Sequence, residues 1–280
     1  RGAFGQIGNG QHGLCDAKGL MRARFAPSPT GLLHLGHAFS ALTNWDMTQL
    51  HSGEFLLRIE DIDQARSRPE FEAAIFEDLA WLGISWEMPV MRQSERRLEY
   101  QSALNTLIEK GICYPCRCSR RDIADAISAP QQDTQPASGP DGPIYPGTCR
   151  HRKMHESQDG DAIRLNMQAA VKAVGNDFGE LDFVELGTGQ TVTERLNADE
   201  LIASFGDIVL ARRDIGVSYH LAVVIDDAAQ KITHVIRGQD ISEATKIHRL
   251  LQALLDLPTP AYHHHRLILD DAGKRLAKRD

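Results

Sequence analysis

The N-terminal part of the chain alternates short apolar runs with segments of helical periodicity, and this alternation constrains the fold most strongly. Residues 22–29 (RARFAPSP) predict a short strand ended by prolines, and a glycine turn and a helix follow at 30–50. Residues 53–63 (GEFLLRIEDID) predict a second strand that ends in acids, and residues 68–83 predict a second helix with Pro69 near its start. Strands that alternate with helices predict an α/β fold built on a parallel sheet.

The regular pattern continues to a helix expected at 94–111, breaks, and resumes near residue 161. The stretch 128–143 (SAPQQDTQPASGPDGP) has almost nothing to bury, so we expect a flexible loop there. Beyond it, the pattern predicts a helix at 242–257. The apolar pattern resumes with DAIRLNM (161–167) and DIVLARRD (207–214), and the runs YHLAVVIDD (219–227) and ITHVIRGQDI (232–241) predict buried strands.

The composition is that of an ordinary soluble protein, with 42% hydrophobic residues in 280, enough for a sizeable core. The net charge of −7 argues against nonspecific coating of nucleic acid, although basic segments at 117–122, 149–153 and 274–279 could bind it locally. No apolar run approaches the roughly 18 to 20 residues of a membrane helix and no export segment is evident, so we expect a cytoplasmic protein. Residues 1–20 lack periodicity, and we treat them as a non-native or disordered leader before Met21.

Four of the five cysteines fall between residues 113 and 149, a clustering more typical of a metal site than of disulfides. Three thiolates and one oxygen donor can complete a tetrahedral structural zinc site and tie together the base of a flexible loop. The residues alone leave two interpretations open, a zinc site and a set of reduced thiols.

Two histidines three residues apart, His34 and His37, stand at the start of the first expected helix with Gly36 between them. On the first turn they share a face, and the glycine keeps the backbone open to the ring of a ligand. A helix N-terminus after a glycine turn, at the carboxyl edge of a parallel sheet, suits a nucleotide phosphate. The alternative is a pair of solvated surface histidines.

Four segments, in order, resemble the motifs of class I aminoacyl-tRNA synthetases in their glutamate and glutamine branch. RFAPSPTGLLHLGH (24–37) resembles the HIGH signature, LLRIEDID (56–63) and HVIRGQDI (234–241) resemble further blocks, and RLAKR (275–279) stands where the family has its KMSKS loop. The resemblance spans residues 22–280. It implies an α/β fold, a Rossmann-type parallel-sheet catalytic domain with an inserted zinc-binding, acceptor-like subdomain.

The same resemblance implies a domain organisation. The first half of the catalytic domain would occupy 21–112, and a zinc-binding insertion with the flexible loop 128–143 would occupy 113–160. The remainder of the insertion and the second half of the catalytic domain would occupy 161–280 and end at the KMSKS-like loop. We also expect the sequence to be clipped, because it does not begin with methionine and the family continues beyond this loop.

The resemblance implies that ATP, escorted by Mg²⁺, activates glutamate as glutamyl-adenylate, after which a nucleic-acid hydroxyl takes the acyl group. Positioning and charge stabilisation dominate such a reaction. His34, His37 and Lys278 would stabilise the phosphates, with Gly36 also at the ATP site. Ala277 and Arg275 depart from the serine and leading lysine of KMSKS, and the lost hydroxyl, worth about 1 kcal/mol, predicts slower adenylation.

Free glutamate carries an ammonium and two carboxylates, so its pocket needs an acid and more than one cation or strong donor. By resemblance, Arg24 and Arg237 face the carboxylates, Glu60 faces the ammonium and Tyr219 closes the pocket. Taken alone, each charged residue is as readily a solvated surface ion, and Tyr219 a core residue. The other residues of the implied glutamate site are Phe25, Ala26, Pro27 and Ser28.

The pair CRC (116–118) and YPGTC (145–149) resembles the zinc site of short paralogues of glutamyl-tRNA synthetase that lack an anticodon-binding domain. Those paralogues attach glutamate to queuosine at the wobble position of tRNA(Asp). The resemblance therefore implies ATP, L-glutamate and the queuosine-containing anticodon loop of tRNA(Asp) as partners, and we expect a monomer. It also implies one structural Zn²⁺, with His151 competing for the place of Tyr145 among the ligands Cys116, Cys118, Tyr145 and Cys149.

Two other functions remain open at this point. The chain could be the catalytic part of a glutamyl-tRNA synthetase that charges the 3′ end of tRNA(Glu). It could also be a paralogue that binds tRNA or nucleotide without catalysis, an interpretation that Ala277 favours.

Overall fold

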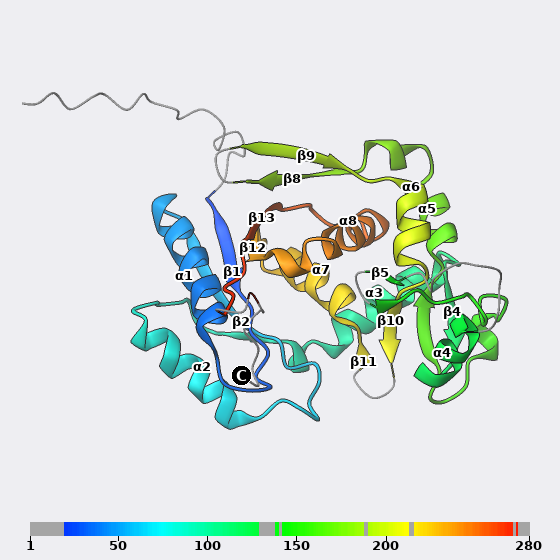
Figure 1. Ribbon diagram of the computed structural model, residues 1–280, viewed down its shortest axis with the longest axis horizontal. Helices are drawn as coiled ribbons and strands as arrows, with labels where there is room; N and C mark the ends of the chain where they lie inside the picture. Colours follow the sequence, from blue (N-terminus) through cyan, green and yellow to red (C-terminus); the bar gives the residue numbers. More distant parts are fainter. Residues whose placement is uncertain are drawn as a thin grey trace, which may run out of the picture.

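The computed structural model describes residues 20–128, 138–139, 142–187, 190–212, 216–270 and 273. Three expectations lie largely or wholly outside these ranges, namely the leader at 1–20, the flexible loop at 128–143 and the KMSKS-like loop with Arg275, Ala277 and Lys278. Elsewhere the chain forms a large sheet covered by helices and a smaller antiparallel sheet beside it (Figure 1).

The large sheet has seven strands in the described ranges, in the order β3-β2-β1-β12-β13-β8-β9. Neighbouring strands pair in parallel from β3 to β8, and β9 is antiparallel to β8. The predicted parallel α/β class is confirmed. The strands are β1 (Arg22–Phe25), β2 (Glu54–Ile59), β3 (Met91–Arg92), β8 (Asp182–Leu186), β9 (Thr191–Arg195), β12 (His234–Gly238) and β13 (Ala261–His265).

The helices that cover this sheet include the four that the sequence predicts, at 30–50, 68–83, 94–111 and 242–257. They correspond to α1 (Leu35–Leu50), α2 (Pro69–Trp81), α3 (Arg97–Glu109) and α8 (Ala244–Leu254). The other helices are α4 (Arg120–Ser128), α5 (Met167–Val174), α6 (Ala198–Glu200) and α7 (Tyr219–Ala229). Short 3₁₀ segments are η1 (Gln93–Glu95), η2 (Met154–Glu156), η3 (Gly175–Glu180) and η5 (Gln239–Ile241), and η4 (Leu201–Phe205) is a π-helical turn.

Residues 219–227 form most of helix α7, so the strand predicted there is wrong. An apolar run of this length fits a buried strand or a buried helix, and periodicity alone does not separate the two. The helix is enclosed on several sides, because Leu221, Ala222 and Val224 are all buried. Ser218 caps its start by accepting a hydrogen bond from the Leu221 N–H at 3.4 Å, and a serine before an apolar run is a helix signal that the strand prediction overlooked.

Successive side chains of β1 and β2 point to opposite layers, as the pleat of a strand requires. Phe25 and Leu57 pack in a core with residues of α1 and α2. Arg24 and Arg58 point to the other layer, where both bond Asp227 of α7. The alternation thus gives the sheet an apolar contact on one face and a charged contact with α7 on the other.

The smaller sheet is antiparallel, with the order β11-β10-β7-β4, and it lies between β3 and β12 in the sequence. Two of its strands fall within the apolar runs at 161–167 and 207–214. Figure 1 shows it beside the large sheet, next to α4. Its strands are β4 (Cys113–Cys116), β7 (Ala162–Leu165), β10 (Val209–Arg212) and β11 (Gly216–Val217), and a separate pair is formed by β5 (Ser138–Gly139) and β6 (Gly142–Pro143).

The strand order reverses between β1 and β12, which are neighbours although the small sheet separates them in the sequence. From β1 the chain proceeds outward through β2 and β3, and from β12 it proceeds the other way to β13. In doubly wound sheets, ligands bind at the carboxyl ends of the strands beside such a reversal. The fold therefore predicts a ligand site at the carboxyl ends of β1, β2 and β12.

The largest apolar core lies between the large sheet and helices α3, α7 and α8. Leu107, Leu221 and Leu251 contribute one fully buried side chain from each of these helices. Within the described ranges, no helix combines the length and the apolar composition that crossing a membrane requires.

Replacing Leu251 with Ala should lower the free energy of unfolding by about 2–5 kcal/mol, because the buried side chain leaves a cavity. The matched control is Leu98→Ala, since Leu98 on α3 is 85% exposed and its truncation should cost less than about 0.5 kcal/mol. Urea unfolding followed by circular dichroism measures both variants. Equally small losses would contradict the placement of α8 in the core.

Candidate active site

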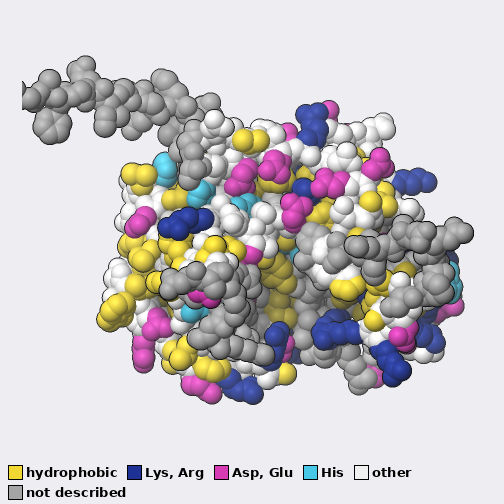
Figure 2. All heavy atoms as spheres, viewed as in Figure 1, with side chains coloured by type: hydrophobic (Ala, Val, Ile, Leu, Met, Phe, Trp, Pro, Cys, Tyr) yellow, Lys and Arg dark blue, Asp and Glu magenta, His cyan; other side chains and the backbone are white. Residues whose placement is uncertain are grey.

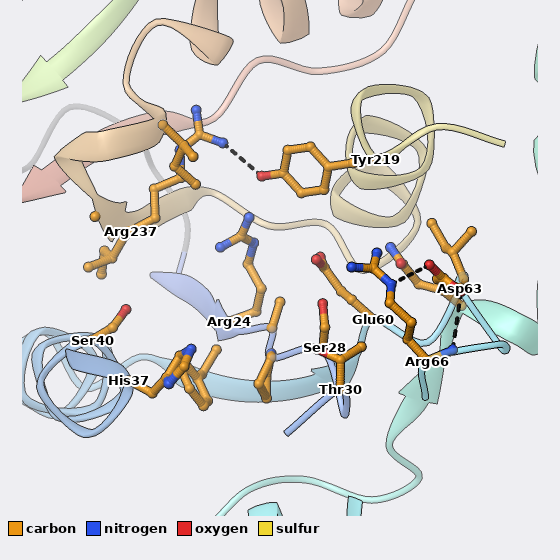
Figure 3. A pocket seen from close by; sticks show the side chains of 18 of the residues that line it. Arg24, Ser28, Thr30, His37, Ser40, Glu60, Asp63, Arg66, Tyr219 and Arg237 are labelled. Carbon is orange, nitrogen blue, oxygen red and sulfur yellow. Dashed lines mark hydrogen bonds and ion pairs between the residues drawn. The ribbon is translucent and has the colours of Figure 1, made fainter. Parts of the chain in front are cut away.

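A pocket of about 600 Å³ lies at the carboxyl ends of β1, β2 and β12, where the fold predicts a ligand site. Figure 3 shows Arg237 and Tyr219 on one side, Ser28, Thr30 and His37 on the other, and Arg24 and Glu60 between them. All eight residues of the predicted glutamate site line this pocket together with His37: Arg24, Phe25, Ala26, Pro27, Ser28, Glu60, Tyr219 and Arg237. Residues from four distant parts of the sequence therefore meet at one place.

The two histidines of the HIGH-like segment build the start of α1. His34 Nδ1 accepts a hydrogen bond from the Gly36 N–H at 3.0 Å, and His37 Nδ1 accepts one from the His34 N–H at 3.2 Å. A Cβ atom at Gly36 would lie 2.9 Å from His34 Cε1, so glycine lets His34 fold back as the helix cap. His37 lines the pocket, and His34 and Gly36 lie at the helix start beside it.

Asp227 of α7 forms ion pairs with two arginines, Arg24 on β1 and Arg58 on β2. It accepts hydrogen bonds from Arg24 Nε at 2.9 Å and Arg24 Nη2 at 3.3 Å, and from Arg58 Nη1 at 2.7 Å. Arg58, which is fully buried, also donates to Glu60 Oε1 at 3.1 Å. The Arg24 charge at the pocket is therefore largely offset by a carboxylate.

The neighbouring Asp226 is fully buried and bonds a different set of groups. It accepts from Gln93 Nε2 at 2.8 Å, from Arg96 Nε at 2.7 Å and from Tyr100 Oη at 2.8 Å. These residues belong to η1 and α3 or lie between them, so Asp226 fixes α7 against the elements that follow β3.

The pKa values of two carboxyl groups of the site, Asp227 and Glu60, are shifted in opposite directions. Burial acts to raise the pKa of Asp227, but the charges of Arg24 and Arg58 and their hydrogen bonds outweigh it and hold that pKa below its usual range. At Glu60 burial outweighs the same two arginines and raises the pKa. The ionised form of Glu60 is therefore disfavoured, and a cation placed beside it would offset this cost.

The pocket contains polar residues that the sequence analysis missed. Asp63 accepts a hydrogen bond from Arg66 Nε at 2.6 Å at the pocket edge. Arg58 and the Asp226–Asp227 pair were missed as well, although a charged residue inside an apolar run is itself a signal of buried pairing. The other polar lining residues outside the prediction are Thr30, Ser40 and Gln93.

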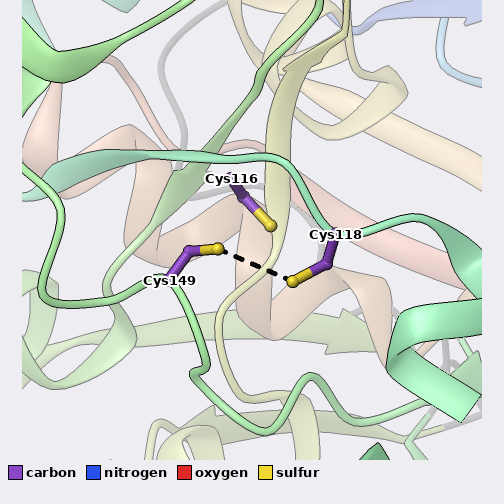
Figure 4. Close-up of side chains that lie close together, drawn as sticks. All are labelled: Cys116, Cys118 and Cys149. Atoms are coloured by element: carbon purple, nitrogen blue, oxygen red, sulfur yellow. Dashed lines mark hydrogen bonds between the residues drawn. The ribbon is translucent and has the colours of Figure 1, made fainter. Parts of the chain in front are cut away.

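The cysteine region forms a compact donor cluster. The sulfur atoms of Cys116, Cys118 and Cys149 lie within 4.8 Å of one another and point toward one another in Figure 4. Tyr145 Oη lies 3.3 Å from Cys116 Sγ and 3.4 Å from Cys118 Sγ, and the Cys118 and Cys149 sulfurs are 3.6 Å apart. Tyr145 is buried in this cluster, whereas the competing His151 is exposed.

These distances fit a tetrahedral metal site. Zinc–sulfur bonds of about 2.3 Å give ligand-to-ligand edges of about 3.8 Å, and edges to an oxygen ligand are slightly shorter. The three separations of 3.3, 3.4 and 3.6 Å lie within a few tenths of an ångström of these edges, and the remaining sulfur pairs lie within 4.8 Å. The donor set, three thiols and a phenol oxygen, is one that zinc can accept.

A second pocket, of about 1060 Å³, lies between the cysteine cluster and the start of α7. Tyr219 lines both pockets, and its neighbour His220 lines the second one. Figure 2 shows Lys and Arg side chains along the lower edge of this face, toward α4 and β10, and acidic side chains at the top near β8 and β9. The arginines that line the second pocket are Arg117, Arg120, Arg164 and Arg212.

The reversal of strand order, the histidine-bearing helix start and the charged pocket together define the catalytic domain of a class I aminoacyl-tRNA synthetase. The sequence profile of tRNA synthetases class I (E and Q), catalytic domain, matches residues 20–280. The chain belongs to this family.

The relatives are consistent with that assignment. The chain is 52% identical over 263 residues to the glutamyl-Q tRNA(Asp) synthetase of Rhodobacter capsulatus, covering 93% of this chain and 91% of that protein. It is 40% identical to a glutamate–tRNA ligase of Synechococcus sp., covering 93% of this chain but 53% of the ligase. The glutamate–tRNA synthetase structure from Elizabethkingia anophelis matches with a TM-score of 0.70 and 29% identity, over 93% of this chain and 53% of that one. The predicted resemblance to the glutamate and glutamine branch is confirmed.

Acid should destabilise the wild-type protein more steeply than an Asp227→Asn variant. The folded-state pKa of Asp227 is depressed, so its contribution is fully present above the unfolded value of about 3.9 and is lost as the pH falls toward the folded value. The variant lacks this group and should be less stable near neutral pH, because Arg24 and Arg58 lose a buried counter-charge.

Urea unfolding at a series of pH values from neutral to strongly acidic measures this difference. Asp125→Asn serves as the matched control, because the Asp125 side chain is 72% exposed. Identical pH slopes for wild type and Asp227→Asn would contradict the charge assignment.

Proposed function

We propose that this protein activates L-glutamate with ATP as glutamyl-adenylate and transfers the glutamyl group to queuosine at the wobble position of tRNA(Asp). The observation that carries the proposal is the pocket that brings Glu60, Arg24 and Arg237 together, where the strand order of the large sheet reverses between β1 and β12. The glutamyl-Q tRNA(Asp) synthetase of Rhodobacter capsulatus, of which the chain covers 91%, supports the choice of acceptor.

In this proposal the charges of glutamate meet opposite charges in the pocket. Arg237 and Arg24 face the carboxylates and attract them by charge, and each guanidinium keeps at least one N–H group beyond those already bonded within the described part of the protein. Glu60 receives the ammonium, which compensates the burial that raises its pKa. Burial also raises the pKa of Tyr219, so its hydroxyl stays neutral and closes the pocket as a polar wall.

Activation places a carboxylate oxygen of glutamate in line with the α-phosphorus of ATP. The new oxygen–phosphorus bond forms as the bond to pyrophosphate breaks, and the pair of electrons leaves with pyrophosphate. His34 and His37 stabilise the phosphate charge from the start of α1, and Lys278 does so from the KMSKS-like loop. Mg²⁺ bound to the ATP phosphates supplies further charge neutralisation.

Transfer then requires a hydroxyl of the acceptor at the carbonyl carbon of the adenylate. The hydroxyl oxygen forms the ester bond, its proton is released, and AMP leaves. The second pocket, with its four arginines and with Tyr219 shared between the pockets, suits an anionic RNA strand that enters beside the adenylate. We propose that the anticodon loop approaches across this pocket.

We further propose that one structural Zn²⁺ is held by Cys116, Cys118, Tyr145 and Cys149. When bound it supplies a cross-link between the end of β4 and the segment 145–149, with no part in the chemical step. The closeness of the four donors supports this assignment. We also propose that the protein works in the cytoplasm as a monomer.

A second candidate function is charging of the 3′ end of tRNA(Glu). The observation that favours it is the 40% identity to a glutamate–tRNA ligase of Synechococcus sp., of which the chain covers 53%. The two functions share the adenylation step and differ in the acceptor.

The acceptor experiment uses labelled glutamate, ATP and three RNAs. We expect label on queuosine-containing tRNA(Asp), none on tRNA(Asp) that lacks queuosine, and none on tRNA(Glu). Nuclease fragments should carry the label in the anticodon loop. Label at the 3′ adenosine of tRNA(Glu) would contradict the proposed acceptor, and an Arg195→Leu control on exposed β9 should label as wild type does.

The metal experiment measures zinc in freshly purified protein by mass spectrometry. Wild type should hold about one zinc per chain, and Cys118→Ser should hold markedly less, because a hydroxyl replaces a thiolate ligand. Cys113→Ala is the matched control, since Cys113 is a buried cysteine that lies outside the cluster. Equal zinc in both variants, or none in wild type, would refute the ligand set.

A further inference from the structure

Arg237 is held in the pocket by four neutral side chains. Its Nε donates to His264 Nε2 at 3.1 Å, and its Nη2 donates to Thr245 Oγ1 at 2.7 Å. Its Nη1 donates to Tyr219 Oη at 3.3 Å and to His248 Nδ1 at 3.2 Å. Four of the five guanidinium N–H groups therefore have partners among the described residues. Arg237 is only 5% exposed, so these partners fix it from behind the pocket.

The partners dictate where each histidine carries its proton. A guanidinium has only donors, so the ring nitrogens that face it must be unprotonated. His264 then carries its proton on Nδ1, which lies 2.7 Å from Glu185 Oε2 on β8. His248 carries its proton on Nε2, which lies 3.2 Å from His220 Nδ1 on α7. Burial and the charge of Arg237 hold the pKa of His248 well below its usual range, which keeps this ring neutral.

Arg24 and Arg237 differ in whether a carboxylate offsets their charge. Arg24 is bonded through two nitrogens to the Asp227 carboxylate, which offsets its charge. Neutral acceptors hold Arg237 without offsetting its charge, so the full positive charge faces the pocket. A fixed guanidinium also avoids the entropic cost of ordering the side chain when substrate binds.

We propose that His264 and His248 are positioning residues for glutamate binding, which together with Thr245 fix the Arg237 guanidinium in the orientation that receives a substrate carboxylate. Glu185 and His220 act one step further out by holding the two rings in the required tautomers. The inference rests on the proposed function and assigns the residues that prepare its carboxylate site.

Glutamate-dependent ATP–pyrophosphate exchange tests this role. His264→Leu fills the space of the ring but offers no acceptor, so the KM for glutamate should rise about tenfold or more. The KM for ATP and kcat should change less than about threefold, because the lost contact acts on glutamate binding. His264→Gln can present its amide oxygen near the position of Nε2, and it should recover most of the wild-type KM for glutamate.

A second pair of variants keeps the test independent of one substitution. Thr245→Val removes the hydroxyl that accepts from Arg237 while keeping the shape, and it should raise the KM for glutamate, whereas Thr245→Ser should not. His263→Gln is the control on the same strand, because the His263 side chain bonds the Leu186 carbonyl and, in the described part of the chain, forms no hydrogen bond with Arg237. Its KM for glutamate should match wild type.

The tautomers provide a readout that does not depend on activity. Nitrogen NMR of histidine-labelled wild type near neutral pH, assigned with His264→Gln, should show His264 protonated on Nδ1. The opposite tautomer would overturn the proposal. Normal wild-type exchange with an unchanged glutamate KM in both His264→Leu and Thr245→Val would overturn it too, as would a His264→Gln variant as impaired as His264→Leu. Wild type without any glutamate-dependent exchange would instead refute the proposed function.

Discussion

Two adjacent buried carboxylates on α7, Asp226 and Asp227, hold the catalytic layer together. Asp227 bonds Arg24 of β1 and Arg58 of β2, and Asp226 bonds groups that follow β3. A buried charge without its partner is costly, so neither the strands nor the helix can shift without breaking several pairs. The start of α7, and with it Tyr219, is thereby fixed beside Arg237 in the candidate pocket.

The charged side chains of the pocket differ in how far their charge is offset by neighbouring groups of the protein. Arg24 belongs to the packing as much as to the pocket, because Asp227 offsets its charge. Arg237 keeps its charge, since tyrosine, threonine and two histidines hold it. Glu60 lies between these extremes, with a pKa that burial raises despite two neighbouring arginines. A ligand with both an ammonium and a carboxylate complements this distribution.

Local patterns predicted much of the fold, because it depends on short segments. The strand–turn–helix order at 22–50 and the apolar run around Arg237 identified elements that meet where the strand order reverses. The pocket residues and the ligand set of the cysteine cluster were predicted from the resemblance to class I synthetases, since each residue taken alone fits a surface or core position equally well. The prediction failed at 219–227, where an unbroken apolar run fits a buried helix as well as a strand. It also missed Arg58 with Asp227 and Arg237 with His264, because long-range pairing leaves no periodic signal in the sequence.

A crystal structure with a non-hydrolysable sulfamoyl analogue of glutamyl-adenylate tests the central claim most directly. The account predicts the free carboxylate of the glutamyl group within hydrogen-bonding distance of Arg237, the ammonium beside Glu60, and the adenosine next to His37 at the start of α1. It also predicts that Arg24 keeps its bond to Asp227 in the complex. A glutamyl group bound elsewhere, with Arg237 still contacting only its four neutral partners, would contradict it.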